Sequence, residues 1–146
     1  MNKVAMEVKG LIEKLGNDIN FGIVFLNEQH SLMSEQEKLL NEEFDSFSIV
    51  KIPATGLSLE QQKEVVFEAG KIEKIDLERN VDITFVFASP VPFLLKELSV
   101  ESRQDGNFFM DCLYDVKVFH NDKREKKELP NGKIIFTVAK EGWQLV

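Results

Sequence analysis

The stretch Val81–Leu98, VDITFVFASPVPFLLKEL, decides the fold of this chain. Its apolar run from Ile83 to Ala88 is almost unbroken, which is typical of a strand buried on both faces of a parallel sheet. Ser89 is a favoured helix N-cap, and Pro90 suits the first helical position, so a helix is predicted to begin there. Apolar residues then recur at helical spacing at Phe93, Leu94, Leu95 and Leu98. The stretch therefore predicts a central strand that leads through a compact polar turn into a helix N-terminus.

Length and composition indicate a single folded domain over residues 1–146. Hydrophobic residues make up 43% of the chain, and it contains twelve Phe, which argues against disorder. No segment approaches the roughly 18–20 continuous apolar residues of a membrane helix, and the amphipathic N-terminus is unlike a secretory signal. Cys112 is the only cysteine, so neither an intrachain disulfide nor a Cys-based zinc site is expected. The simplest expectation is a cytoplasmic protein without membrane contact.

The net charge of −7 limits the classes of partner. An acidic chain disfavours a long nucleic acid held by diffuse basic attraction. A short phosphorylated ligand stays compatible with the charge, because backbone N–H groups and one or two cations can hold it. The acidity is equally explained by solubility alone.

Helical and strand patterns alternate along the chain as far as Leu98. An amphipathic helix is predicted within residues 1–17, and capping-box patterns at Ser34–Glu37 and Ser58–Gln61 predict two more helix starts, the last helix running to Leu77. Strands are predicted at Phe21–Leu26, Phe47–Ile52 and Ile83–Ala88. This alternation predicts an α/β fold, a Rossmann-like three-layer α/β/α arrangement with a mainly parallel sheet and right-handed crossovers.

The pattern changes in the C-terminal region, residues 108–146. Strands are predicted at Leu113–Phe119 and Ile134–Val138, separated by a charged excursion over residues 121–130 and a strong turn signal at Pro130–Gly132. We expect an antiparallel hairpin added at an edge of the sheet, with a short edge element after Gly142. The mixed-charge run Lys123–Lys127 is typical of a solvated hairpin tip. Alternatively, it contacts a partner or forms a lid over the ligand edge.

Three polar turns follow the three predicted parallel strands, at Asn27–His30, Ala54–Gly56 and Ser89–Val91. Because the carboxyl ends of parallel strands share one edge of a sheet, these turns are expected to converge where open α/β sheets bind ligands. Backbone N–H groups near Ser89 would face a phosphate or ribose, and Gly56 would let a ligand approach the backbone. The same residues also suit an ordinary helix cap and an ordinary turn. The candidate ligand-binding residues are Asn27, Thr55, Gly56, Ser89, Pro90 and Val91.

No standard catalytic or cofactor motif is present. The chain lacks Gly-x-Ser-x-Gly, P-loop and Gly-x-Gly-x-x-Gly sequences, which excludes a serine hydrolase elbow, a Walker-type NTPase and a standard dinucleotide fingerprint. His30 and His120 are the only histidines, so no metal and no cofactor are predicted. Cys112 is better explained as a packed thiol than as a nucleophile. A nuclease would need a histidine, Lys51 or Lys96 beside the phosphodiester, and the spacing does not indicate one.

The segment from Asn20 to Val146 resembles the Rossmann-like CARF and SAVED sensor domains of prokaryotic antiviral systems. The similar features are the order of strands and helices, the sequence Ala88-Ser-Pro-Val-Pro-Phe93 after a late strand, and Val116-Lys-Val-Phe119 followed by polar residues. The resemblance implies binding of a cyclic oligonucleotide second messenger. It places contacts at the backbone of Ser89, Pro90 and Val91, at the Thr55–Gly56 turn and at Asn27.

This sequence departs from the family pattern in two ways. The helix after Pro92 continues Leu-Leu-Lys-Glu-Leu without the expected glycine, and SAVED proteins carry two such units where this chain has one. The resemblance therefore implies pairing with a second copy or an effector protein, because a cyclic ligand sits across two half-sites.

Three functions follow as hypotheses. The first is a cytoplasmic sensor that oligomerises and binds a nucleotide-derived messenger without metal or covalent chemistry. The second is a phosphodiesterase that cleaves such a ring, with His30 or a lysine assisting. The third is a non-enzymatic, oligomerising interaction subunit that uses the N-terminal helix and the C-terminal hairpin. An exposed apolar patch there, together with a filled pocket at the strand edge, would favour it.

Overall fold

The computed structural model describes residues 1–72, 79–103 and 114–146. Within these ranges no helix is long and apolar enough to cross a membrane. The elements in chain order are α1 (Lys3–Glu13), β1 (Asn20–Asn27), α2 (Ser34–Glu43), β2 (Ser46–Ile52), α3 (Leu59–Ala69), β3 (Asp82–Phe87), α5 (Pro92–Arg103), β4 (Asp115–His120), β5 (Arg124–Glu128), β6 (Ile134–Val138) and β7 (Gln144–Leu145).

The central sheet has the strand order β2-β1-β3-β4-β7. The first four strands are parallel, and β7 joins β4 antiparallel at the edge. The chain passes from β1 to β2 on one side and then returns to β3 on the other side of β1. The order of the strands therefore reverses between β1 and β3, which makes their carboxyl ends the topological switch point of the sheet. The predicted α/β, mainly parallel Rossmann-like fold is confirmed.

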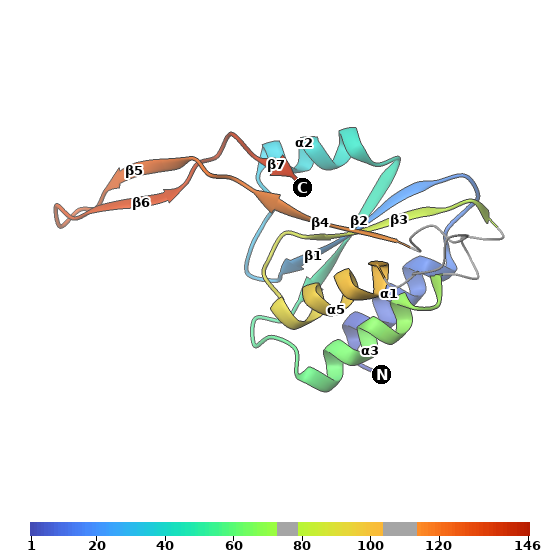
Figure 1. The fold of residues 1–146 in the computed structure, drawn as a ribbon. Coiled ribbons are helices and arrows are strands. Elements are labelled where there is room, and N and C mark those ends of the chain that lie inside the picture. The colour runs from blue at the N-terminus through green and yellow to red at the C-terminus, as the bar shows by residue number, and fades with distance from the viewer. Residues whose placement is uncertain (73–78, 104–113) are drawn as a thin grey trace.

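Helices cover both faces of this sheet, with α2 on one face and α1, α3 and α5 on the other (Figure 1). Side chains of β1 point alternately to the two faces of the sheet. Ile23 and Phe25 pack into the core beneath α1, α3 and α5, whereas Val24 packs with Leu40 of α2. The rings of Phe25 and Phe85 stack with centroids 5.8 Å apart. The two central strands β1 and β3 are buried on both faces, which explains their nearly continuous apolar sequences.

Helix boundaries differ from the sequence predictions at two places before β3. The Ser58 capping box is confirmed, but α2 has Met33 as its N-cap, and the Gln36 side chain accepts a hydrogen bond from the Met33 N–H at 2.9 Å. The helix predicted to reach Leu77 ends at Ala69, with Gly70 as its C-cap. Its predicted extension over residues 73–78 lies outside the described residues.

In the C-terminal region the predicted antiparallel hairpin, its strand Ile134–Val138 and the short edge element after Gly142 are confirmed, but the pairing of one strand differs. The described part of the predicted hairpin strand Leu113–Phe119 belongs to β4, the fourth parallel strand of the main sheet. The charged run is not a loop but strand β5, and it pairs with β6 in a separate two-stranded sheet. The turn at Gly132 is confirmed, with a φ of 80°. α5 continues to Arg103, and Cys112 lies outside the described residues.

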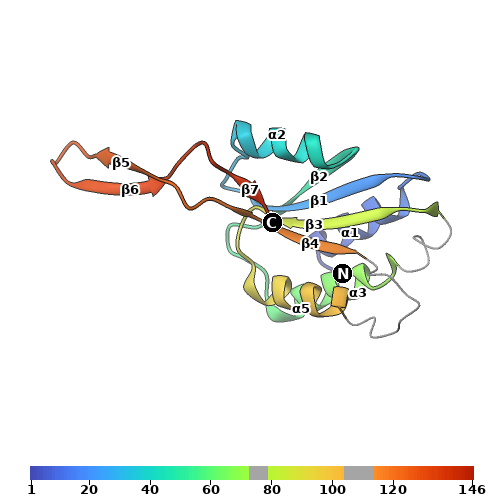
Figure 2. The same cartoon turned by 45° about the horizontal axis from the view of Figure 1, so that its top comes forward.

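The two-stranded sheet projects away from the body of the protein, beyond the carboxyl edge of the parallel strands (Figures 1 and 2). We call residues 122–140 the arm. Because β4 is parallel to its neighbours, the chain leaves the sheet at the same edge as the three predicted turns. The arm and the candidate ligand site are therefore neighbours.

Candidate functional site

Ser89 joins the carboxyl ends of β1 and β3 at the switch point. Its Oγ accepts a hydrogen bond from the Asn27 N–H at 2.9 Å, and its own N–H donates to the Phe25 carbonyl oxygen at 3.2 Å. Only 5% of Ser89 is exposed. The hydroxyl is therefore held between the two strands, where it satisfies a backbone donor at the strand end.

The prediction that Ser89 caps the following helix is wrong. α5 begins at Pro92, so this second proline occupies the first helical position in place of Pro90. The Val91 carbonyl accepts the first helical hydrogen bond, from Leu95 N–H at 2.9 Å. Proline fixes φ and lacks an N–H, which suits either position from sequence alone. The backbone between Ala88 and Val91 instead crosses from the strand to the helix without helical turns.

The N-terminus of α5 has few donors left for an anion. Pro92 has no N–H, and the Leu94 N–H donates to the Gln62 Oε1 from α3 at 3.1 Å. The Nε2 of Gln62 donates to the Leu57 carbonyl at 3.0 Å, which fixes the orientation of the Gln62 side-chain amide. A side chain from a neighbouring helix therefore fills part of the position that a phosphate would take.

The first two polar turns are also joined to each other. The Glu28 N–H donates to the Ile52 carbonyl at 2.8 Å, and the Glu28 Oε1 accepts from the Ala54 N–H at 2.7 Å. Gly56 adopts a φ of 81°, and its N–H donates to the Pro53 carbonyl at 2.8 Å. The structure thus brings Asn27, the Ala54–Gly56 turn and Ser89 to one edge, as the topology predicts. Several N–H groups that were expected to face a ligand are bonded within the protein.

The exposed residues at this edge include two nitrogen-bearing side chains. His30 Nδ1 lies 3.5 Å from Ser89 Oγ, and Lys51 Nζ lies 3.4 Å from the His30 carbonyl oxygen. Thr55 and Pro90 are exposed, whereas 8% of Val91 is exposed. His30 and Lys51 are therefore the groups placed to meet an anion here.

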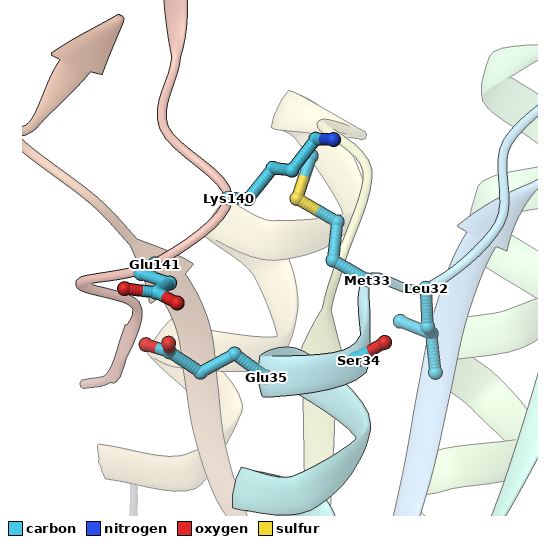
Figure 3. Close-up of a pocket in the computed structure, with 6 residues that line it drawn as sticks. All are labelled: Leu32, Met33, Ser34, Glu35, Lys140 and Glu141. Carbon is cyan, nitrogen blue, oxygen red and sulfur yellow. The ribbon is translucent and has the colours of Figure 1, made fainter.

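A hollow of about 550 Å³ lies between the start of α2 and the base of the arm (Figure 3). Glu35 Oε1 accepts hydrogen bonds from the N–H groups of Gly142 and Trp143, at 2.8 and 2.7 Å. The carboxyl groups of Glu35 and Glu141 point toward each other, while Lys140 extends beside Met33. The lining residues are Leu32, Met33, Ser34, Glu35, Lys140 and Glu141. With two carboxylates and one amine, the lining does not favour an anionic ligand.

The arm presents apolar side chains to solvent. Ile134, Phe136 and Val138 are 51%, 68% and 38% exposed, and they lie on one face because side chains alternate along a strand. Their cross-strand partners in β5 are Glu128, Lys126 and Arg124. We call these three β6 residues the apolar row.

Asn121 holds the base of the arm together. It is 6% exposed, and its Nδ2 donates to the carbonyls of Ala139 and Glu141, at 3.0 Å in each case. Its Oδ1 accepts from the Lys123 N–H at 3.0 Å. One side chain therefore bonds to both ends of the arm and fixes the point at which it leaves the body.

Among the described residues no group of three or more His, Cys, Asp or Glu is placed to hold a metal ion. No family model, curated protein or solved structure matches this chain.

Three functional features were not found from the sequence: Glu35, Asn121 and the apolar row. The alternation Ile134-x-Phe136-x-Val138 was a signal for the row, but its exposure depends on the absence of a covering element. Glu35 and Asn121 act on residues distant in the sequence, and nothing in their local sequence indicates these partners.

Proposed function

We propose that this chain is a non-enzymatic interaction subunit that binds another protein through the arm. The observation that carries the proposal is the apolar row, three exposed side chains on a projecting two-stranded sheet. An isolated two-stranded hairpin is marginally stable in water at best, and exposed apolar patches mark interaction sites. Contact with a partner would bury the apolar row and would at the same time stabilise the hairpin.

The outer edge of β6 supports the same proposal. Natural edge strands are protected by charges or proline, and β6 contains neither in its sequence IIFTV. β5, by contrast, consists entirely of charged residues, Arg-Glu-Lys-Lys-Glu. The unprotected edge and the apolar row both belong to β6, so β6 is the strand that meets the partner.

The carboxyl edge of the main sheet is consistent with this role. Ser89, Glu28 and Gln62 supply acceptors to N–H groups that a phosphate ligand would otherwise use. N–H groups at the strand ends that are already bonded within the protein, together with an exposed apolar patch, are the combination expected of an interaction subunit.

Site-specific photo-crosslinking tests the proposal. A photoreactive amino acid replaces Phe136 in cells that produce the protein, and the matched control replaces Thr55, which is exposed on the body. Discrete adducts with one other polypeptide are expected from position 136 and not from position 55. The absence of adducts at position 136 would overturn the role of the arm.

A second candidate is binding of a nucleotide-derived messenger at the carboxyl edge, with Asn27, Thr55, Gly56, Ser89, Pro90 and Val91 around it. It is favoured by one observation: His30 and Lys51 lie together at that edge. Incubation with cyclic oligonucleotides tests it. Binding lost in Lys51→Ala and His30→Ala would support a sensor, and return of cleaved ligand would support the phosphodiesterase alternative.

A further inference from the structure

We propose that the partner of the arm is a second copy of this chain, and that the arm docks on the α3 surface of that copy around Phe67. This inference rests on the proposed function, because it names the protein that the arm binds. Two copies would exchange arms about a twofold axis, each arm contacting the body of the other.

The charge of the chain is divided between arm and body in a way that favours this contact. The arm, residues 122–140, carries six basic and three acidic residues, a net charge of +3. The rest of the chain carries 12 basic and 22 acidic residues, a net charge of −10. An arm is therefore attracted to the body of another copy and repelled by another arm.

The α3 surface offers the matching apolar group. Phe67 is 68% exposed, the same fraction as Phe136, and Leu59 on the same helix is 49% exposed. Phe67 lines a hollow of about 410 Å³ together with Met1, Glu60, Lys63, Glu64 and Glu68, and Lys63 Nζ lies 3.4 Å from Glu60 Oε1. An aromatic ring beside carboxylates complements the arm, where Phe136 lies beside Lys126.

A buried carboxylate lies beside Phe67 in the same hollow and is paired with a lysine. Glu68 lines the same hollow and is 1% exposed; its Oε1 pairs with Lys71 Nζ at 3.0 Å. Its Oε2 has no hydrogen-bond partner among the described residues. The Lys71 amine lies 4.8 Å from the centre of the Phe67 ring, so this chain already places one cation on the ring. The part of the ring that remains exposed is the group that the apolar row of an arm would contact.

The arm cannot reach this surface within its own chain. Figures 1 and 2 show it extending past the carboxyl edge, away from the layer of α1, α3 and α5. Asn121 fixes its base to the main sheet, so the contact requires a second copy.

Analytical ultracentrifugation of the full chain tests the inference, with Phe136→Glu, Phe67→Glu and the control Met6→Glu. Met6 is 59% exposed on α1, beside a different hollow. We expect the wild type and Met6→Glu to dimerise alike, and both Phe variants to dissociate about tenfold or more readily. Added salt should weaken the wild-type dimer. Circular dichroism confirms that each variant is folded.

The outcomes separate the two proposals. A wild type that stays monomeric, or a Phe67→Glu variant that dimerises like the wild type, would overturn the docking on α3 of a second copy. If the photo-crosslink from position 136 then captures a different protein, the interaction function is supported and only the proposal of a second copy as partner is wrong. If it gives no adduct, the interaction function and the second-copy proposal are both wrong.

Discussion

The Oγ of Ser89 accepts a hydrogen bond from the Asn27 N–H at 2.9 Å and so joins two parallel strands whose residues lie 62 positions apart. This bond closes the switch point between β1 and β3, the position where open α/β sheets usually admit a ligand. The Ser89 hydroxyl therefore holds the carboxyl ends of the two strands together.

Replacing Ser89 by Ala should lower the free energy of unfolding by about 1–2 kcal/mol, because a partly buried N–H loses its acceptor. Urea unfolding measures the change. Ser31→Ala, an exposed serine in the β1–α2 connection, is the control and should have little effect. Equal stability of the two variants would show that the hydroxyl does not join the strands.

Replacing Glu35 by Gln should loosen the C-terminal segment from α2, since a charged acceptor for two N–H groups is lost. We expect a loss of about 1–3 kcal/mol in urea unfolding. Trp143 is the only tryptophan, so its fluorescence reports the same region directly. Glu37→Gln, in the same first turn of α2, is the matched control for the helix dipole. Unchanged fluorescence and stability in Glu35→Gln would contradict this link between Glu35 and the C-terminal segment.

The link between α1 and α3 should make stability depend on pH. The backbone N–H of Asn2, and then its side chain, donate to Glu64 and hold the pKa of that carboxyl below its ordinary value of 4.5. A lowered pKa in the folded state stabilises the protein above pH 4.5, and this contribution is lost as the pH falls through the folded value.

Urea unfolding of the wild type, Glu64→Gln and the control Glu60→Gln, at pH values from above 4.5 downward, measures this contribution. The Glu64 variant should lose less stability on acidification than the wild type, and the Glu60 variant should follow the wild type. Parallel pH profiles for the wild type and Glu64→Gln would contradict the assignment.

Two glycine-to-alanine changes should have opposite signs. A Cβ at Gly22 of β1 would lie 2.8 Å from the Phe44 ring, which is 5% exposed, so Gly22→Ala should destabilise by about 1–3 kcal/mol. A Cβ at Gly10 of α1 meets nothing within 4 Å, and Gly10→Ala should stabilise by about 0.5–1 kcal/mol. Thermal unfolding of both variants checks the signs, and a stabilised Gly22→Ala would show that the α2 layer packs less closely.

The fold could be predicted from the sequence because buried parallel strands leave continuous apolar runs, as at Ile83–Ala88. The Ser58 capping box is equally local, since its two side chains bond within four residues. The sequence Ser-Pro-Val-Pro contains two prolines, and either one suits the first position of a helix. The helix begins at Pro92, because Ser89 is bonded to the end of β1 and does not cap a helix.

The candidate site was predictable only in its position. Parallel strands place the three turns at one edge, but their partners are long-range: Gln62 reaches α5, and Glu35 reaches the C-terminal segment. The charged run Lys123–Lys127 has the composition of a loop, and its pairing with β6 makes it a strand. Charge alone could not reveal a projecting arm.

The most direct test of the interaction function, with a second copy of the chain as the partner, is the thermal midpoint of the full chain, measured at several protein concentrations with and without linear and cyclic nucleotides. Binding to the native state raises the midpoint by mass action. We expect a midpoint that rises with protein concentration and does not respond to any nucleotide. A midpoint independent of protein concentration but raised selectively by a cyclic oligonucleotide would contradict it and would establish a ligand sensor instead.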